Sequence, residues 1–264
     1  MSSSYIIAGG DAGRVRLSVL SQAMAPFTGA LLDRLDDWEG LSVLDAGCGG
    51  GDVSRELAAR VGRAGRVVGV DGDEAKIAAA REAALDIPQL SFRDGDAITP
   101  GPDDPFDVIY VRFLLSHLTD PAGALVSFRS RLKPGGLLIA EDVDFTGHFA
   151  DPTVPALDRY VAWYRETAAR RGANADLGRD LAARVAAAGF TTLHGGDAHP
   201  VARRGPVKAM APLTLAAIAD AVVAAGLATR DDVDQTVAEL QTAADDPAIL
   251  LSMPRIGQVI GRVP

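Results

Sequence analysis

Short aliphatic runs alternate along the first half of the chain with segments whose apolar residues recur at helical spacing. The runs predict strands at 41–46, 66–71, 90–94, 106–111 and 137–143. The segments between them predict helices at about 52–61, from Asp73 to a stop before Pro88, and at about 121–132. This alternation is typical of βαβ units, which build a mostly parallel sheet with right-handed crossovers.

The pattern changes towards both ends of the chain. Apolar positions at helical spacing over 13–37, interrupted by Pro26, predict two N-terminal helices. After residue 150 the pattern predicts helices at 153–171 and 177–188, a strand at 190–193, a helix-rich stretch at 206–245 and a last strand at 255–262. We therefore expect an α/β fold, with a Rossmann-like, seven-stranded, mostly parallel sheet and helices on both faces. The expected parts are N-terminal lid helices (1–40), a core (41–200), a small helical cap (201–252) and the final strand of the core (253–264).

Composition narrows the class of protein. The 264 residues include 26 basic and 35 acidic side chains, a net charge of −9, which argues against nucleic acid as a partner. The single cysteine excludes an internal disulfide framework and fits a cytoplasmic location. We find no signal peptide and no apolar run long enough to span a bilayer, so no membrane partner is expected. A homodimer is left open.

A glycine-dense turn follows the first predicted strand. Counted from Gly47, the dinucleotide fingerprint G-x-G-x-x-G places its third glycine at position 52, where the chain has Asp52. A carboxylate at a helix start stabilises the helix but repels a phosphate there. The pattern is instead Asp-x-Gly-x-Gly-x-Gly from Asp45 to Gly51, which favours a ligand without phosphate. Cys48, inside this turn, is typical of a small buried thiol.

Two further acids follow later strands. Asp71 ends the second strand and is placed to hydrogen-bond a ribose diol, although an acid before Gly72 is also common in plain turns. The same acid would serve NAD equally well. Asp96, between Gly95 and Ala97, is either a contact for a base or an ordinary Asx turn.

In order and spacing over residues 41–143, these motifs resemble those of the class I S-adenosylmethionine (SAM) methyltransferases. The segment Phe106–Arg112 and the Lys133-Pro134-Gly135-Gly136 turn complete the resemblance. The N-terminal segment, 141–149 and the closing strand are similar to bacterial small-molecule methyltransferases near the ubiquinone/menaquinone-biosynthesis type. The resemblance implies SAM as the cofactor. It assigns Asp45, Gly47, Cys48 and Gly49 to the methionine end, Asp71 and Gly72 to the ribose, Asp96 and Ala97 to the adenine, and Tyr5 to a lid. Independently of the resemblance, Arg112 directly follows the fourth predicted strand and is placed to contact a carboxylate of cofactor or acceptor.

Candidate catalytic groups lie near the ends of the fourth and fifth strands. His117 has a side chain suited to proton transfer, or packs against the cofactor loop. Asp142 belongs to a run of acids, at least one of which we expect to face the acceptor. His148 is the preferred general base, and a surface-loop histidine is the alternative. No spacing is typical of a zinc or calcium site, so no metal is predicted.

The acceptor pocket is expected between the N-terminal helices, residues 150–175 and the cap. Tyr160, Trp163 and Tyr164 either line it or pack their helix onto the core. The leading hypothesis is methyl transfer from SAM to an O, N or C atom of a small organic acceptor. An NAD-linked oxidoreductase stays open as an alternative, although Asp52 opposes it. A third hypothesis is a methyltransferase-fold protein that binds SAM without transferring methyl, because its cofactor motifs would be the same.

Overall fold

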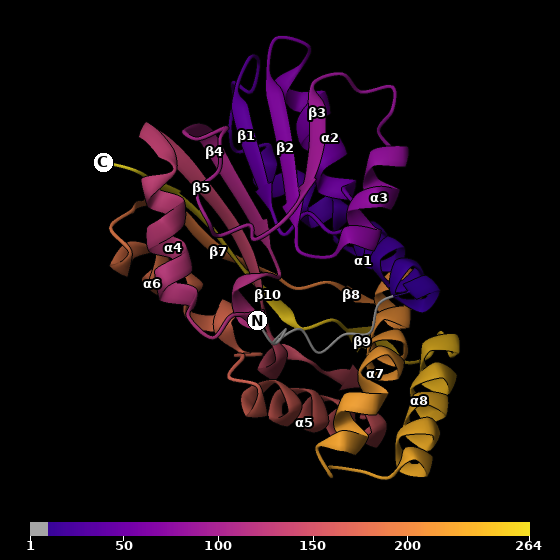
Figure 1. Cartoon of the computed structure of the whole chain (residues 1–264). Coiled ribbons are helices and arrows are strands. Elements are labelled where there is room, and N and C mark those ends of the chain that lie inside the picture. The colour runs from indigo at the N-terminus through magenta and orange to yellow at the C-terminus, as the bar shows by residue number, and fades with distance from the viewer. Residues whose placement is uncertain (1–9) are drawn as a thin grey trace.

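The computed structural model of the chain describes residues 10–264, without the side chains of residues 10–12 and 14. The described residues form a seven-stranded sheet in the order β3-β2-β1-β4-β5-β10-β7 (Figure 1). β1 to β5 are parallel, whereas β10 is antiparallel to both of its neighbours. The strands of this sheet are β1 (Ser42–Ala46), β2 (Arg66–Asp71), β3 (Leu90–Asp94), β4 (Phe106–Arg112), β5 (Leu132–Asp144), β7 (Thr191–Ala198) and β10 (Arg255–Arg262).

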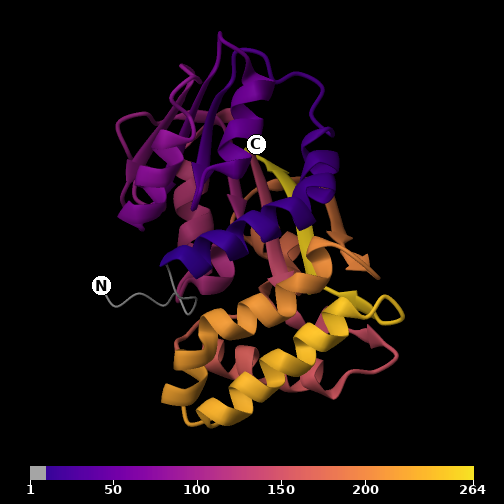
Figure 2. The same ribbon diagram turned by 90° about the vertical axis from the view of Figure 1, so that its right-hand side faces the viewer.

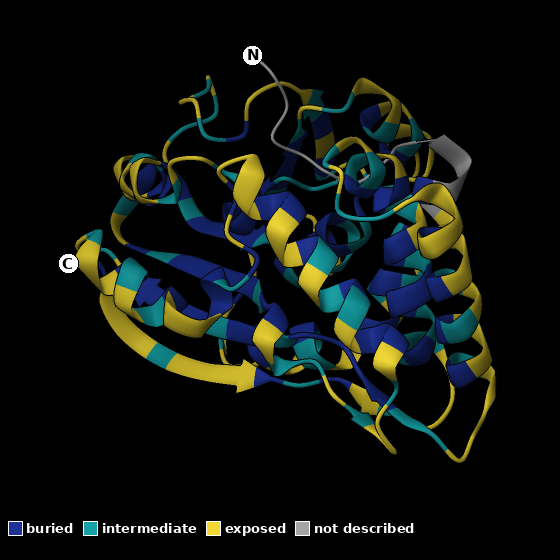
Figure 3. Cartoon of the chain, turned by 90° about the horizontal axis from the view of Figure 1, so that it is seen from below, coloured by how far each residue is buried: buried dark blue, intermediate teal, exposed yellow. Residues whose placement is uncertain are grey.

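Helices cover both faces of the sheet, because each strand presents apolar side chains alternately to either side. In β1, Val43 packs with α2, α3 and the end of α1, whereas Leu44 packs with α4 and α6. The strands are largely buried except for the edge strand β7, which is mostly exposed, while the surrounding helices each have a buried and an exposed side (Figure 3). These helices are α1 (Gly10–Leu32), α2 (Asp52–Val61), α3 (Glu74–Glu82), α4 (Pro121–Ser130) and α6 (Leu181–Ala187), with 3-10 turns η1 (Leu115–His117), η2 (Phe145–Gly147) and η3 (Leu177–Asp180). The expected Rossmann-like architecture is confirmed.

A separate hydrophobic cluster holds a helical layer below the carboxyl ends of the parallel strands. It consists of α5 (Pro155–Arg170), α7 (Pro206–Ala224) and α8 (Arg230–Asp245), which contact one another. A small sheet of β6 (Ala150–Asp151), β9 (Leu250–Ser252) and β8 (Val201–Ala202) adjoins it. In Figure 2, α1 crosses between the sheet and this layer, and it packs on α7. The structure thus adds α5 to the cap that the sequence places at 201–252.

Three local expectations are wrong. Pro26 does not divide the N-terminal helix, since α1 continues through it. The apolar face of that helix buries Met24, Leu31 and Leu32, and such packing outweighs the cost of about 3 kcal/mol for an interior proline. β5 begins at Leu132 and not at 137, and the turn expected before the strand lies inside it, where the pairing with β4 jumps from Leu132 to Leu137 and Gly135 has φ +75°. Leu85, expected on a helix face, is 82% exposed beyond the end of α3.

The expectation that no apolar run could span a bilayer also needs correction. Among the described residues, α7 is long and apolar enough by length and composition. Half of that window is buried inside the fold, where α7 contacts α1, α5 and α8. A core helix passes the same test, so one such helix is weak evidence for a membrane span.

Candidate active site

A cavity of about 930 Å³ opens where the carboxyl ends of β1, β2 and β4 face the helical layer. This is the place where ligands bind in open α/β sheets. Its walls come from the glycine loop, from the ends of β2 and β4 and from α1, α5 and α7. It brings together most of the residues predicted from sequence: Asp45, Gly47, Cys48, Gly49, Asp71, Gly72, Asp96, Ala97, Arg112, His117 and His148.

The glycine loop is tied to β2 by its backbone. The amides of Gly47 and Cys48 donate to Val70 O at 2.8 and 3.1 Å. Gly51 is the N-cap of α2 with φ +76°, and a Cβ there would lie 2.6 Å from Phe92 Cζ. Only glycine satisfies both the left-handed backbone and this close approach. Asp52 is therefore the first residue of the helix, where its charge favours the helix dipole.

Asp45 lies at the base of the cavity and is almost fully buried. It accepts a hydrogen bond of 2.5 Å from Ser54 Oγ on α2, so it joins the end of β1 to the helix after the loop. Burial raises its pKa to about 6, although the Ser54 hydrogen bond and the Arg112 charge lower it. Burial also raises the pKa of the Cys48 thiol, with the Asp45 and Asp71 charges adding to it, so Cys48 is neutral.

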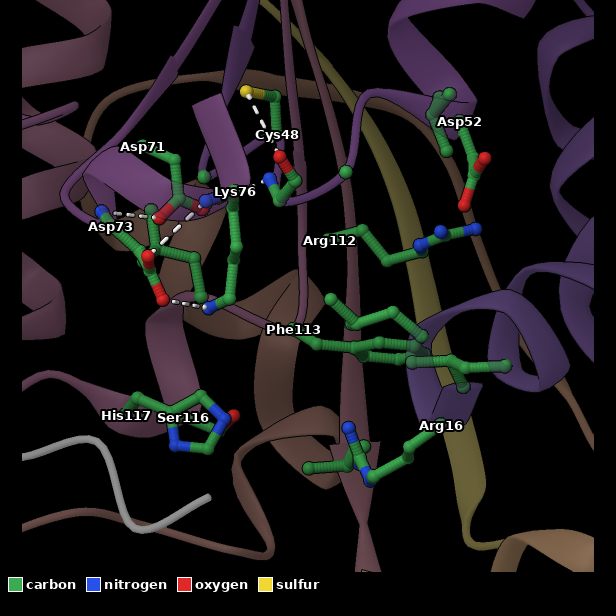
Figure 4. A pocket seen from close by; sticks show the side chains of 18 of the residues that line it. Arg16, Cys48, Asp52, Asp71, Asp73, Lys76, Arg112, Phe113, Ser116 and His117 are labelled. Carbon is green, nitrogen blue, oxygen red and sulfur yellow. Dashed lines mark hydrogen bonds and ion pairs between the residues drawn. The ribbon is translucent and has the colours of Figure 1, made fainter. Parts of the chain in front are cut away.

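Asp71 orders the turn beside the loop. Its two carboxylate oxygens accept from the amides of Gly49 at 2.9 Å and Asp73 at 3.0 Å. Asp73 in turn caps α3, as the sequence predicts, and its carboxylate pairs with Lys76 (Figure 4). Each oxygen of Asp71 retains a further lone pair that a hydroxyl donor could use.

Asp96 lies in the cavity wall, as a contact for a base requires, and it also forms the Asx turn that was the other interpretation. It lines the cavity, and its carboxylate also accepts from the Ile98 amide at 2.9 Å and from Thr99 Oγ1 at 2.9 Å. The Asx turn is therefore present, and it fixes the Asp96 side chain at the rim of the cavity.

A buried polar network surrounds the ends of β4 and β5 beside the glycine loop. Glu141 accepts hydrogen bonds from Tyr110, from Thr28 on α1 at 2.8 Å and from Gln258 on β10 at 2.7 Å. Arg112 donates to Thr28 at 3.2 Å. Burial lowers the pKa of Arg112, but the Tyr110, Glu141 and Asp45 charges outweigh it and raise the pKa, so this guanidinium stays charged.

Phe113 separates two cations of the cavity. It follows β4 with φ +55°, the only positive φ of a non-glycine residue in the described chain. Such a backbone costs of order 1–3 kcal/mol and is typical of functional sites. In Figure 4 the side chain of Phe113 lies between Arg112, on the side of Asp52, and Arg16. Arg112 thus belongs to the glycine-loop side of the cavity and Arg16 to the other.

Both predicted histidines line the cavity in neutral form. Burial, reinforced by the Arg16 and Lys76 charges, lowers the pKa of His117 to about 4. Burial lowers the pKa of His148 to about 3. His148 Nδ1 lies 3.1 Å from Ser252 O, a carbonyl that can only accept, so the proton is on Nδ1. Nε2 is consequently an acceptor, and it is buried without a hydrogen-bond partner.

Among the described residues, one predicted catalytic residue falls outside the cavity. Asp142 does not line it, because its carboxylate is fully buried and accepts from the backbone amides of Ser116 at 3.0 Å and Val143 at 2.8 Å. Asp142 therefore holds the turn η1 against β5, and the prediction that it is a catalytic residue in the acceptor pocket is wrong. Tyr5 lies outside the described residues. Within residues 10–264, no group of His, Cys, Asp and Glu side chains is arranged to hold a metal ion.

The far side of the cavity contains residues that sequence reasoning missed. Arg16 and Leu20 from α1, Met210 and Thr214 from α7 and Phe113 line it. Tyr160 and Tyr164 of α5 also line it, as one of the two interpretations expects, whereas Trp163 packs at the edge of the helical cluster. No local motif marks these positions. The only signal in the sequence is that Arg16 precedes Leu20 by four residues, on one face of a predicted helix, which does not by itself indicate a polar group inside the protein.

A family model described as "Methyltransferase domain" matches residues 37–180. The chain is 33% identical over 165 residues to a 2-phytyl-1,4-naphtoquinone methyltransferase of Thermosynechococcus vestitus, covering 56% of this chain and 71% of that protein. It is 30% identical over 127 residues to a demethylmenaquinone methyltransferase of Staphylococcus aureus, covering 48% and 50%. A Streptomyces fradiae transposon protein is 33% identical over 171 residues, covering 64% and 49%. The chain thus spans about half the length of two of these three relatives.

Solved structures share the fold at low sequence identity. The geranyl diphosphate C-methyltransferase of Streptomyces coelicolor superposes with a TM-score of 0.56 at 15% identity, covering 94% of this chain and 82% of that one. The [4+2]-cyclase SpnF superposes with a TM-score of 0.57 at 20% identity, covering 92% and 82%. These likenesses concern the fold alone.

Proposed function

The chain belongs to the SAM-dependent methyltransferase family, and we propose that its cavity binds SAM together with a small organic acceptor that receives the methyl group. The observation that carries this proposal is a single cavity in which the glycine loop, Asp71 and Asp96 line one side and α1, α5 and α7 line the other. The relatives named as quinone methyltransferases support a small-molecule acceptor.

The residues of the glycine-loop side fit SAM better than a dinucleotide. SAM has no phosphate, and the start of α2 carries the carboxylate of Asp52, which would repel one. Asp71 can accept from a ribose diol while it holds the Gly49 amide. Asp45 and Arg112 offer opposite charges at the inner end of the loop, which suits the amino and carboxylate groups of a methionine end. Asp96 with Ala97 would hold the adenine.

When bound, SAM supplies an electrophilic methyl group that passes to a nucleophilic atom of the acceptor. The chain's own task is to hold the acceptor, exclude water and take up a proton where the acceptor has one to lose. Phe113 and the aromatic residues of α5 give the cavity an apolar wall, which favours the exclusion of water. His148 Nε2 is the candidate proton acceptor, because its lone pair is free of protein partners. His117 is a neutral wall residue of the same chamber.

A binding experiment tests the cofactor. We expect calorimetry to show binding of SAM and S-adenosylhomocysteine, and none of NAD. Asp71→Asn should weaken both SAM ligands about tenfold or more, because it removes a charged acceptor. Asp94→Asn is the matched control, since Asp94 is exposed, pairs with Arg81 and lies outside the cavity. Binding of NAD without binding of SAM would contradict the proposal.

Two properties stay predictions alongside this function. We expect the protein to act in the cytoplasm, without nucleic acid or membrane as a partner, and a homodimer is left open.

A SAM-binding protein that transfers no methyl group would have the same cofactor side, and the [4+2]-cyclase shows that proteins of this fold carry names of other reactions. A screen of candidate acceptors with methyl-labelled SAM separates the two functions, because only a methyltransferase yields labelled product.

A further inference from the structure

Arg16 is a cation buried inside the cavity wall. Its residue is only 8% exposed, yet it lines the cavity. Its Nε donates to Thr214 Oγ1 of α7 at 3.0 Å, which fixes the guanidinium between α1 and α7. In the described part of the chain no carboxylate forms an ion pair with Arg16. A buried charge without a counter-charge is costly, so it is typical of a binding site for an anion.

Charge is divided between the two sides of the cavity. The glycine-loop side contains the carboxylates Asp45, Asp52, Asp71, Asp73, Glu74 and Asp96, and the cation Lys76, which pairs with Asp73. The charge of Arg112 acts on Asp45, whereas that of Arg16 acts on His117 and Tyr160, whose pKa values it lowers. Arg16 therefore belongs electrostatically to the chamber on the acceptor side. His117 and Tyr160, on which Arg16 acts, and His148, which packs against Tyr160, are neutral near pH 7.

The remaining walls of this chamber are apolar and aromatic. Phe145 and Tyr164 stack with ring centroids 3.8 Å apart and planes at 9°, and Tyr160 meets both edge-on. Met210 and Met253 line the same space, and thioethers adapt to ligands of irregular shape. Such walls favour a flat or extended apolar body over a sugar or a peptide.

We propose that the acceptor is an apolar carboxylic acid, whose carboxylate binds the Arg16 guanidinium while its body lies against the aromatic wall of Phe145, Tyr160 and Tyr164. Guanidinium matches carboxylate with two parallel hydrogen bonds, and Nε is already used by Thr214, which leaves the two terminal nitrogens for the ligand. This inference rests on the proposed function, because it concerns the second ligand of the same cavity.

The test uses the protein saturated with S-adenosylhomocysteine and three probe acids, namely benzoate, 2-naphthoate and decanoate, each beside its neutral carboxamide. We expect calorimetry to show at least one acid binding about tenfold tighter than its amide, because the amide lacks the charge that pairs with arginine. Arg16→Met should remove this preference and weaken that acid about 10- to 100-fold, because it leaves the apolar stem but no cation. Its affinity for S-adenosylhomocysteine should stay within about twofold, since Arg16 lies on the acceptor side.

Arg34→Met is the matched control, since Arg34 is exposed beyond the end of α1 and should leave all affinities unchanged. Thr214→Val keeps the charge but removes the partner of Nε, so a smaller loss of the same preference is expected even if Arg16→Met folds poorly. Equal binding of acids and amides, or no binding of any acid, would overturn the inference alone. An equal loss of S-adenosylhomocysteine binding in Arg16→Met would assign Arg16 to the cofactor. Failure of the wild-type protein to bind S-adenosylhomocysteine would overturn the proposed function itself.

Discussion

His148 shows how one side chain receives its chemical character from its surroundings. Its ring meets Phe145 and Tyr160 edge-on, at centroid distances of 5.2 and 5.6 Å, and Ser252 O holds Nδ1. These neighbours offer no negative charge that would stabilise an imidazolium, so burial lowers the pKa to about 3. The neutral tautomer with a free Nε2 lone pair consequently persists over the whole physiological pH range.

We expect His148→Gln to lower kcat about 100-fold, which is the usual contribution of a general base. The affinity for S-adenosylhomocysteine should stay unchanged, because His148 lies on the acceptor side. At saturating SAM, the wild-type kcat should show no acidic limb from His148 near pH 6.5, since the histidine is neutral well below that pH. The measurement is turnover of an acceptor found with labelled SAM, against His194→Gln on β7 as the control. An equal loss of cofactor affinity would place His148 in the cofactor site instead.

The shape of the glycine loop depends more on the glycine at position 51 than on the number of glycines in the loop. Gly50 and Gly51 are adjacent, but only Gly51 has a positive φ and lies against Phe92 and Ala80. A Cβ on Gly50 would meet nothing within 4 Å. The two glycines therefore form a natural pair for separating backbone strain from general flexibility.

We expect Gly51→Ala to lower the free energy of unfolding by about 1–3 kcal/mol, because the alanine needs a strained backbone and collides with Phe92. Gly50→Ala should change it by less than about 0.5 kcal/mol, the usual range for open positions. Chemical denaturation of both variants measures the difference. Similar values for the two would show that the loop adjusts to a side chain at position 51.

Elements whose signal is local were predicted well from the sequence. β1, β2 and β10 follow from aliphatic runs that stay buried, and Asp73 caps α3 as expected. The break at Pro26 was wrong, because the packing of Met24 and Leu31 acts from outside the segment. The early start of β5 was also missed, because Leu132 joins the sheet through Phe106 of β4, and residues 133–136 then interrupt the pairing until Leu137.

The residues of the cavity also differ in whether a local signal in the sequence could predict them. The glycine-loop side of the cavity was predictable, since Asp45 and Asp71 lie at the ends of strands, Asp96 follows one, and parallel strands end at one edge. Asp142 was misplaced because the run of acids does not show that the Ser116 amide takes its carboxylate. Arg16 could not be found, because its place in the cavity depends on the packing of α1 on α7, far apart in sequence.

At the scale of the whole molecule, buried ionisable groups make stability depend on pH in opposite directions. His117 and His148 have pKa values of about 4 and 3, below the unfolded value of 6.5. Below pH 6.5 the unfolded chain therefore binds protons that the folded protein does not, and stability falls. Asp45 and Asp142 have pKa values raised from 3.8 to about 6. Their contribution is present at low pH and is lost as the pH rises through 6.

Replacing His148 isolates the contribution of one buried histidine to the pH dependence of stability. Between pH 7 and 4.5 an unprotonated buried histidine costs up to about 2.5 kcal/mol of stability, from 1.36 kcal/mol per pH unit below 6.5. We expect His148→Gln to lose that much less stability than the wild type over this interval, because glutamine binds no proton in either state. Denaturant titrations at the two pH values measure the change, and His194→Gln, on the exposed edge strand β7, should behave nearly as the wild type. If His148→Gln loses as much stability as the wild type, the imidazole is protonated in the folded protein, and its assignment as a neutral base fails.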